Sequence, residues 1–286
     1  MYTTLITVAQ LQTLLASGQP PIVFDCSFQL MQPTAGDAQY LESHIPSALR
    51  ADLDRHLSAA KGDPDAASGG RHPLPSRQAF ASWLGNVGLT PERQVVVYDR
   101  QAANYCGRLW WMLKWLGHEA VAVLDGGLPA WIAAGGAVEA GKGPTPQSSK
   151  YSPDPVESGL VAADTIAKNL GKPIQTVIDA RGEPRFRGEV EPLDPVAGHI
   201  PGALNRPFTQ NIDANGFFRP AAELRAEFEA LLAGRNPATV VHHCGSGVSA
   251  VPNILAMEIA GLGRTSLYAG SWSDWCSDPS RPVAQG

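Results

Sequence analysis

The residues best suited to chemistry form the stretch 243–250, which reads His-Cys-Gly-Ser-Gly-Val-Ser-Ala. The apolar run 239–241 precedes it and an apolar, helix-like segment follows it, so Cys244 is expected where a buried strand ends and a helix begins. Gly245 and Gly247 let the backbone bend tightly, so that successive N–H groups point into one bowl. The positive end of the following helix favours the thiolate form of a cysteine placed there. We therefore interpret Cys244 as a nucleophile.

The spacing also argues against one class of cysteine chemistry. His-Cys-x-x-Gly-x-x is the frame of cysteine-dependent phosphatases, whose next residue is an arginine that binds phosphate with its planar guanidinium group. In this chain that position is Ala250. A phosphomonoester would meet backbone amides but no guanidinium group, so phosphatase activity is a minor alternative. The loop better suits a cysteine that accepts and carries a smaller group.

Composition limits the class of protein and of partner. The chain has 286 residues, of which 44% are hydrophobic and 17% charged, with a net charge of −5. This balance gives no reason to expect nucleic acid or a membrane as partner, and no run of apolar residues predicts a membrane span. The first residues lack the pattern of a secretory signal. Four scattered cysteines without zinc-ligand spacing predict no metal and fit a reducing, cytoplasmic location.

Two halves of the chain resemble each other. The sequence His-Ile-Pro-Ser-Ala-Leu at 44–49 returns as His-Ile-Pro-Gly-Ala-Leu at 199–204, and the apolar run ending at Asp25 returns as the run ending at Asp179. A repeat this long indicates duplicated domains rather than a solenoid. Because His44 and His199 occur in both halves, we interpret both as structural.

Short apolar runs alternate with helical patterns in each half, which predicts an α/β fold with a mainly parallel sheet flanked by helices. The expected strands are 22–24, 95–98 and 121–124 in the first half and 177–178, 240–243 and 266–268 in the second, with helices at 104–116 and 251–260. We predict a first domain at 1–140, a linker at 141–158 and a second domain at 159–286. Alignment of the halves places Asp99 opposite Cys244, so the first domain is expected to lack the nucleophile and to wall a cleft.

A duplicated α/β domain with a cysteine loop only in its second copy resembles the tandem-domain rhodanese sulfurtransferases. The loop of residues 244–250 is similar to the Cys-Gly-Ser-Gly-Val-Thr-Ala loop of the 3-mercaptopyruvate sulfurtransferase type, with Ser249 in place of threonine. The basic residues that usually follow the cysteine in thiosulfate sulfurtransferases are absent. The resemblance implies two rhodanese-like domains and places the loop residues at the substrate: Gly245, Gly247, Val248 and Ser249.

The resemblance also implies a proton-handling triad of serine, histidine and aspartate. The serine corresponds to Ser246 in the loop. The aspartate matches Asp54 in Asp52-Leu53-Asp54, and the histidine matches His72 before Pro-Leu-Pro. A neutral imidazole oriented by a carboxylate can take a proton from a hydroxyl or from the donor thiol.

Two arginines commonly hold the substrate in this family, and this chain departs from that pattern. One corresponds to the segment Arg185-Phe186-Arg187, where we assign the role to Arg187. The other usually lies just before Gly-His-Ile-Pro, but residues 189–197 contain no arginine. We therefore consider Arg206 as a substitute. A second departure is Ala269, where the family usually has aspartate and for which we have no functional interpretation.

The predicted reaction is ping-pong transfer of a sulfane sulfur from 3-mercaptopyruvate to a thiol, thioredoxin or cyanide, through a persulfide on Cys244. The first alternative is the same chemistry with thiosulfate as donor, and a remote one is a non-catalytic persulfide carrier or sensor. We expect no metal or organic cofactor, no nucleic-acid or membrane partner, and a monomer. The sequence leaves open whether the loop of residues 61–76 closes over the site.

Overall fold

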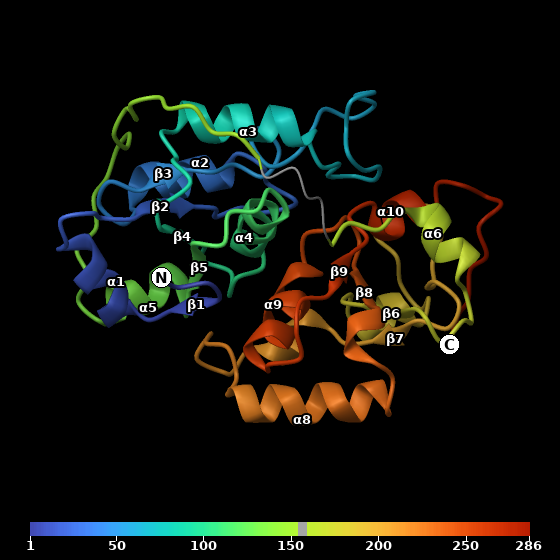
Figure 1. Cartoon of the computed structure of the whole chain (residues 1–286). Coiled ribbons are helices and arrows are strands. Elements are labelled where there is room, and N and C mark those ends of the chain that lie inside the picture. The colour runs from blue at the N-terminus through green and yellow to red at the C-terminus, as the bar shows by residue number, and fades with distance from the viewer. Residues whose placement is uncertain (154–158) are drawn as a thin grey trace. The chain divides into compact units, whose positions relative to one another are not determined.

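The computed structural model describes residues 1–153 and 159–286, which form two compact units (Figure 1). The first unit comprises Met1–Ala60, Pro75–Glu157 and Ala214–Phe217, and the second comprises Lys61–Leu74, Ser158–Asp213 and Phe218–Gly286. The end of the predicted linker, residues 154–158, lies outside the described residues. Two segments belong by their contacts to the other unit than the predicted boundaries give them. Lys61–Leu74 lies within 1–140 but belongs to the second unit, and Ala214–Phe217 lies within 159–286 but belongs to the first.

The first unit is built on a parallel sheet with the strand order β1-β5-β4-β2-β3. Its strands are β1 (Leu5–Ile6), β2 (Ile22–Asp25), β3 (Leu49–Arg50), β4 (Val95–Tyr98) and β5 (Val121–Leu124). Its helices are α1 (Val8–Leu15), α2 (Ala35–Glu42), α3 (Arg77–Asn86), α4 (Cys106–Trp115) and α5 (Gly127–Ala133). β4 reads Val-Val-Val-Tyr and is buried throughout, as expected of a central parallel strand covered on both faces.

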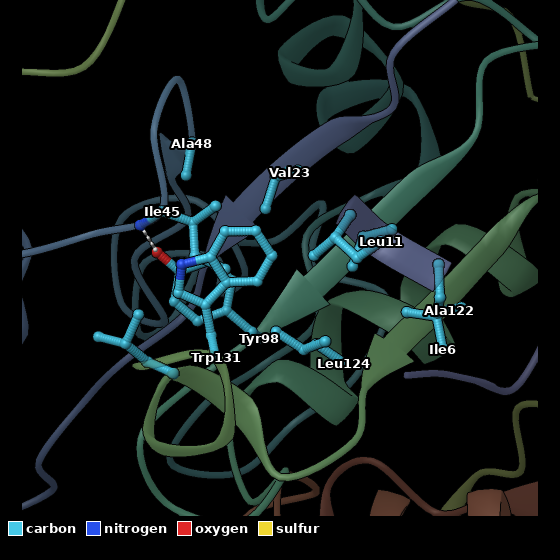
Figure 2. Packing of buried hydrophobic residues seen from close by; sticks show 11 residues of the cluster. Ile6, Leu11, Val23, Ile45, Ala48, Tyr98, Ala122, Leu124 and Trp131 are labelled. Atoms are coloured by element: carbon cyan, nitrogen blue, oxygen red, sulfur yellow. Dashed lines mark hydrogen bonds between the residues drawn. The ribbon is translucent and has the colours of Figure 1, made fainter. Parts of the chain in front are cut away.

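Alternate residues of these strands form the core of the first unit on one face of the sheet. Figure 2 shows this cluster, in which Tyr98 and Trp131 lie among aliphatic side chains from the strands and α1. The hydroxyl oxygen of Tyr98 accepts a hydrogen bond of 3.1 Å from the backbone N–H of Ile45, so the buried phenol is not left without a partner. α4 packs against β4 and β5.

The second unit repeats the plan with the strand order β7-β6-β8-β9, again all parallel. Its strands are β6 (Thr176–Asp179), β7 (Leu204–Asn205), β8 (Val240–His243) and β9 (Ser266–Leu267). Its helices are α6 (Ala163–Lys168), α7 (Glu183–Phe186), α8 (Ala221–Leu232), α9 (Val251–Ile259) and α10 (Ser271–Trp275), with 3-10 turns at Phe208–Asn211 and Pro237–Thr239. A single parallel bridge from Leu160 to Leu267 occupies the edge that β1 fills in the first unit.

The duplication and the α/β fold expected from the sequence are confirmed. His44 and His199 are buried equivalents: each hydrogen-bonds a carbonyl oxygen, and each stacks on an aromatic ring, that of Tyr40 and that of Phe186 respectively. These contacts support the structural interpretation of both histidines. No helix in the described part of the chain is long and apolar enough to cross a membrane.

Candidate active site

Cys244 begins the loop that joins the carboxyl end of β8 to α9 (Figure 1). Its side chain is buried, with 2% of its surface exposed. The loop turns tightly at Gly247, whose φ of +76° lies in the region that favours glycine. A Cβ atom at this position would also collide with the carbonyl group of Ala269. Glycine is therefore required at 247 both by the backbone conformation and by the neighbouring chain.

The first turn of α10 holds the start of this loop. The N–H groups of Trp272 and Ser273 donate to the carbonyl oxygens of Cys244 (3.0 Å) and Gly245 (2.9 Å). The N–H of Cys244 donates to the hydroxyl oxygen of Ser271 (3.1 Å). These three bonds fix the position of the cysteine relative to the sheet.

The remainder of the loop presents hydrogen-bond donors. Within residues 1–153 and 159–286, five of its N–H groups have no hydrogen-bond acceptor: those of Gly245, Ser246, Val248, Ser249 and Ala250. Successive N–H groups in such a turn form a concave site for an anion or for a developing negative charge. The loop can therefore stabilise negative charge on a sulfur attached to Cys244.

The structure brings together two members of the predicted triad. The imidazole Nδ1 of His72 lies 2.7 Å from the hydroxyl oxygen of Ser246. Both side chains are buried, with 6% and 7% of their surface exposed. His72 reaches the loop because Lys61–Leu74 belongs to the second unit. A proton can move between this imidazole and the hydroxyl group, depending on the histidine tautomer.

Asp54, the third predicted member, belongs to the first unit and follows β3 on an exposed turn. Partial burial, and then the negative charge of Asp52, raise the pKa of the Asp54 carboxyl group above its usual value. The role of Asp54 in orienting His72 stays a prediction.

A buried charged cluster lies beside Cys244 at the carboxyl end of β6. The guanidinium group of Arg181 binds the carboxylate of Asp179 (2.6 Å) and stacks on the ring of Trp272 (4.6 Å). Burial favours the neutral form of Asp179, but His243 and Arg181 outweigh burial and hold its pKa below the usual range. Burial tends to lower the pKa of Arg181, yet Asp179 and, more weakly, Glu191 and Cys244 raise it. The guanidinium group therefore attracts a negative charge on the cysteine.

Two arginine side chains flank the loop at Gly245. A Cβ atom placed on Gly245 would lie 3.2 Å from Nη2 of Arg71 and 3.6 Å from Nη1 of Arg185. Sequence reasoning passed over both residues. Arg71 directly precedes His72 in the sequence, and this neighbour was the available signal. Arg185 stands two positions before the arginine that was chosen.

The substrate-binding role assigned to Arg187 is not supported by its surroundings. Its side chain is 41% exposed, and its guanidinium group forms ion pairs with Glu183 (3.2 Å) and Glu189 (2.7 Å). Arg187 is the C-cap of α7, whereas Arg185 lies within that helix. Successive helical residues are rotated by about 100°, so positions two apart point in different directions. We therefore consider Arg185, rather than Arg187, the candidate for the substrate-binding arginine of this segment.

Arg206 also has a different role from the one considered. Its buried guanidinium group binds the side chains of Asn211 (3.0 Å) and Glu227 (2.8 Å) and covers the ring of Phe228. Burial lowers the pKa of this arginine despite the neighbouring Glu227. These contacts tie β7 to α8 and occupy the group that a substrate would need. We interpret Arg206 as structural.

The site therefore combines a buried cysteine, a set of N–H donors without acceptors in the described residues, a serine–histidine pair and two guanidinium groups. In the part of the chain that the structure describes, no three His, Cys, Asp or Glu residues are arranged to hold a metal ion. Residues 7–134 and 162–278 each match the model of the rhodanese-like domain. The chain belongs to the rhodanese-like domain family. Its tandem organisation spans nearly the whole length.

Two rhodanese-like proteins that resemble this chain along nearly their full length are named as sulfurtransferases. A protein of Pseudomonas aeruginosa, named a probable 3-mercaptopyruvate sulfurtransferase, is 46% identical over 285 residues, which cover 99% of this chain and 98% of that protein. A putative thiosulfate sulfurtransferase, SseB of Mycobacterium tuberculosis, is 39% identical over 288 residues, covering 99% and 97%. The crystal structure of SseA from Escherichia coli, described as a 3-mercaptopyruvate sulfotransferase, superimposes with a TM-score of 0.79 at 28% identity, covering 95% of this chain and all of that one.

Proposed function

We propose that this rhodanese-like protein is a sulfurtransferase that moves a sulfane sulfur from 3-mercaptopyruvate to a thiophilic acceptor through a persulfide on Cys244. The observation that carries the proposal is the loop after β8, where a buried cysteine lies among unpaired N–H groups and beside the Ser246–His72 pair. The name of the 46% identical relative supports the choice of donor.

In the first half-reaction the Cys244 thiolate attacks the sulfur of 3-mercaptopyruvate. A bond forms between Sγ and that sulfur, and the carbon–sulfur bond breaks with its electron pair moving to carbon as the enolate of pyruvate. The proton of the donor thiol ends on this carbon, and the Ser246–His72 pair is suited to carry it. The loop N–H groups stabilise the persulfide anion.

In the second half-reaction an acceptor thiolate or cyanide attacks the outer sulfur of the persulfide. The sulfur–sulfur bond breaks, and its electron pair returns to Sγ of Cys244. The enzyme is thereby restored without any net oxidation or reduction of the protein. The acceptor class is a small thiol, thioredoxin or cyanide.

The deciding experiment is steady-state turnover of 3-mercaptopyruvate and of thiosulfate with a thiol acceptor, on the wild type and on Cys244→Ser. We expect a higher kcat/KM for 3-mercaptopyruvate and no turnover by the variant, because a serine hydroxyl cannot form the persulfide. Appreciable turnover by Cys244→Ser would refute the role of the cysteine.

Thiosulfate is the second candidate donor. It is favoured by the absence of arginine from residues 189–197 and by the name of the 39% identical relative. Equal or faster turnover of thiosulfate in the same assay would select it. A persulfide carrier, in contrast, would take up one sulfur per chain and show no multiple turnover.

Oligomeric state and location follow as further proposals. We propose a monomer in a reducing, cytoplasmic compartment, supported by four cysteines that are all free thiols. Light scattering of the purified protein tests the first of these, and fractionation of the producing cell tests the second.

A further inference from the structure

Arg71 occupies an unusual position for a residue from the first half of the sequence. Its segment, Lys61–Leu74, belongs to the second unit, and its backbone N–H donates to the hydroxyl oxygen of Ser273 in α10 (3.0 Å). The same helix holds the first two residues of the Cys244 loop. The segment and the loop are therefore anchored to one helix, which places Arg71 reproducibly beside Gly245.

Asp194 holds the guanidinium group of Arg71 in this place. Nη1 of Arg71 lies 2.7 Å from Oδ1 of Asp194, whose side chain is only 4% exposed. The other carboxylate oxygen of Asp194 lies 3.4 Å from Nη2 of Arg185, which also pairs with Glu191 (2.6 Å). Asp194 thus brings two guanidinium groups to the same loop from two distant segments.

The ion pair with Asp194 does not use all the donors of Arg71. Its Nε atom is buried and has no hydrogen-bond partner in the described residues, whereas its Nη2 atom lies next to Gly245. The side chain keeps 27% of its surface exposed and borders a cavity of about 640 Å³ in the second unit, which Asp194 and Ser273 also line. An anion in this cavity can meet the guanidinium group next to the nucleophilic loop.

We propose that Arg71 is a specificity-determining residue that binds the carboxylate of the sulfur donor together with Arg185. Asp194 lies in the stretch 189–197, which contains no arginine. Its carboxylate binds Arg71 and so places a guanidinium group beside this stretch. A planar guanidinium group and a carboxylate match through two parallel hydrogen bonds. Three guanidinium groups near the loop pair with three carboxylates: Arg71, Arg181 and Arg185 with Asp179, Glu191 and Asp194. Because these charges balance, the site suits a monoanionic carboxylate better than a dianion.

This inference rests on the proposed sulfur transfer, and the variants Arg71→Lys and Arg71→Gln test it. Lysine keeps the positive charge but loses the planar fork. We expect Arg71→Lys to lower kcat/KM for 3-mercaptopyruvate at least 10-fold, mainly through KM, and that for thiosulfate less than 3-fold. Arg71→Gln is expected to impair both donors. Arg225→Gln is the control, because in the described part of the chain that exposed arginine pairs only with Glu229 and with the carbonyl oxygen of Ala260 at the end of α9.

Other outcomes overturn the inference. Equal losses of kcat on both donors in Arg71→Lys would indicate that Arg71 only holds its segment in place, and an unaffected Arg71→Gln would show that it does not meet the donor. Thermal unfolding of each variant checks that the fold is retained.

A binding measurement separates this inference from the proposed function. Pyruvate is titrated calorimetrically into Cys244→Ser and into Cys244→Ser/Arg71→Lys. We expect at least 10-fold weaker binding by the double variant. Arg71-dependent binding of pyruvate, together with no turnover of either donor by the wild type, would support the carboxylate site while refuting the reaction. Equal binding by both proteins would refute the site.

Discussion

At the scale of single residues, the contact between Ser246 and His72 carries the most chemical information. Their polar atoms lie 2.7 Å apart inside a buried environment, so a proton can be shared without exchange with bulk water. The two groups should therefore act as one unit rather than as independent contributors.

Removing either partner is expected to slow the transfer of sulfur to Cys244. We expect Ser246→Ala and His72→Gln each to lower kcat roughly 100-fold, in line with the usual effect of a positioned acid–base group. The double variant should be little worse than either single one, because groups that act as a unit are non-additive. Rapid-quench measurement of pyruvate release checks this, and fully multiplied losses would contradict the pairing.

The two arginines around α7 give a second test at this scale. Arg185→Gln removes a guanidinium group beside Gly245, so KM for 3-mercaptopyruvate should rise about 10-fold or more, as expected for a lost charged hydrogen bond of about 1.5–3 kcal/mol. Arg187→Gln removes only exposed ion pairs, which contribute little in water, and the kinetics should stay within about 2-fold. A larger effect of Arg187→Gln than of Arg185→Gln on KM would support Arg187 as the substrate-binding arginine, as assigned from the sequence.

The choice between these arginines shows what sequence patterns leave undecided. The motif Arg-Phe-Arg correctly located the segment near the loop, but spacing alone did not say which side chain faces it. That depends on where the helix ends, and α7 ends between the two arginines. Apart from its position next to His72, no sequence pattern marked Arg71 as a site residue. Its place beside the loop depends on a contact with Asp194, which lies 123 positions away in the sequence.

At the scale of elements, strands and helices were predicted more reliably than the segments between them. β4 and β8 are short apolar runs between turn signals, and both occupy the residues expected from the sequence. α9 ends one residue earlier than expected, at Ile259. The segment Lys61–Leu74 has no hydrophobic periodicity from which its packing partners could be predicted. That it belongs to the second unit is therefore seen only in the tertiary structure.

The turn at Gly247 gives a prediction for the loop as an element. Gly247→Ala should destabilise the fold by about 2 kcal/mol or more and abolish turnover, because the residue has a positive φ and abuts Ala269. Gly171→Ala is the matched control, since Gly171 has a φ of +71° with no atom within 4 Å of an added Cβ. Thermal unfolding and turnover are compared for both. Equal effects of the two substitutions would show that close contact with Ala269 does not matter.

The buried His242 of β8 should make the stability of the protein depend on pH. Burial lowers the pKa of His242 from 6.5 to about 3, so the folded protein keeps this imidazole neutral while the unfolded chain protonates it. Between these values the unfolded state binds the extra proton, and the free energy of unfolding falls as the pH is lowered. His242 should contribute up to about 1.4 kcal/mol per pH unit in this window.

Denaturant unfolding of wild type and His242→Gln between pH 6 and pH 4.5 measures that contribution. Other histidines whose pKa is lowered, such as His243, titrate in the same direction and remain in the variant. The variant should therefore show a shallower slope, whatever its absolute stability. Identical slopes would mean that His242 is not kept neutral in the folded protein.

At the scale of the whole molecule, the duplicated halves are not independent along the chain. The second unit includes Lys61–Leu74 from the first half of the sequence, and the first unit includes Ala214–Phe217 from the second half. Cys244 is encoded in one half, whereas His72 is encoded in the other. We therefore expect function to require both halves, even though only one carries the cysteine loop.

Replacing Lys61–Leu74 by a Gly/Ser segment of the same length tests this dependence. We expect turnover to fall at least as far as in His72→Gln, while Cys244 still reacts with iodoacetamide, because the sheet and the bonds from α10 to Cys244 are formed by other residues. Replacing only residues 62–66 is the control, since it leaves Arg71 and His72 in the chain. Full activity after the longer replacement would show that the segment is dispensable.

The exchange of segments also sets an order of events in folding. Contacts of His72 with Ser246 and of Arg71 with Asp194 join residues 174 and 123 positions apart. Contacts of long sequence separation form slowly, because the chain entropy of closing the loop must be lost before the contact stabilises it. During synthesis the segment 61–74 leaves the ribosome long before its partners exist. Both sheets can thus become native before the active site does, and catalytic competence should be the last property that a refolding chain regains.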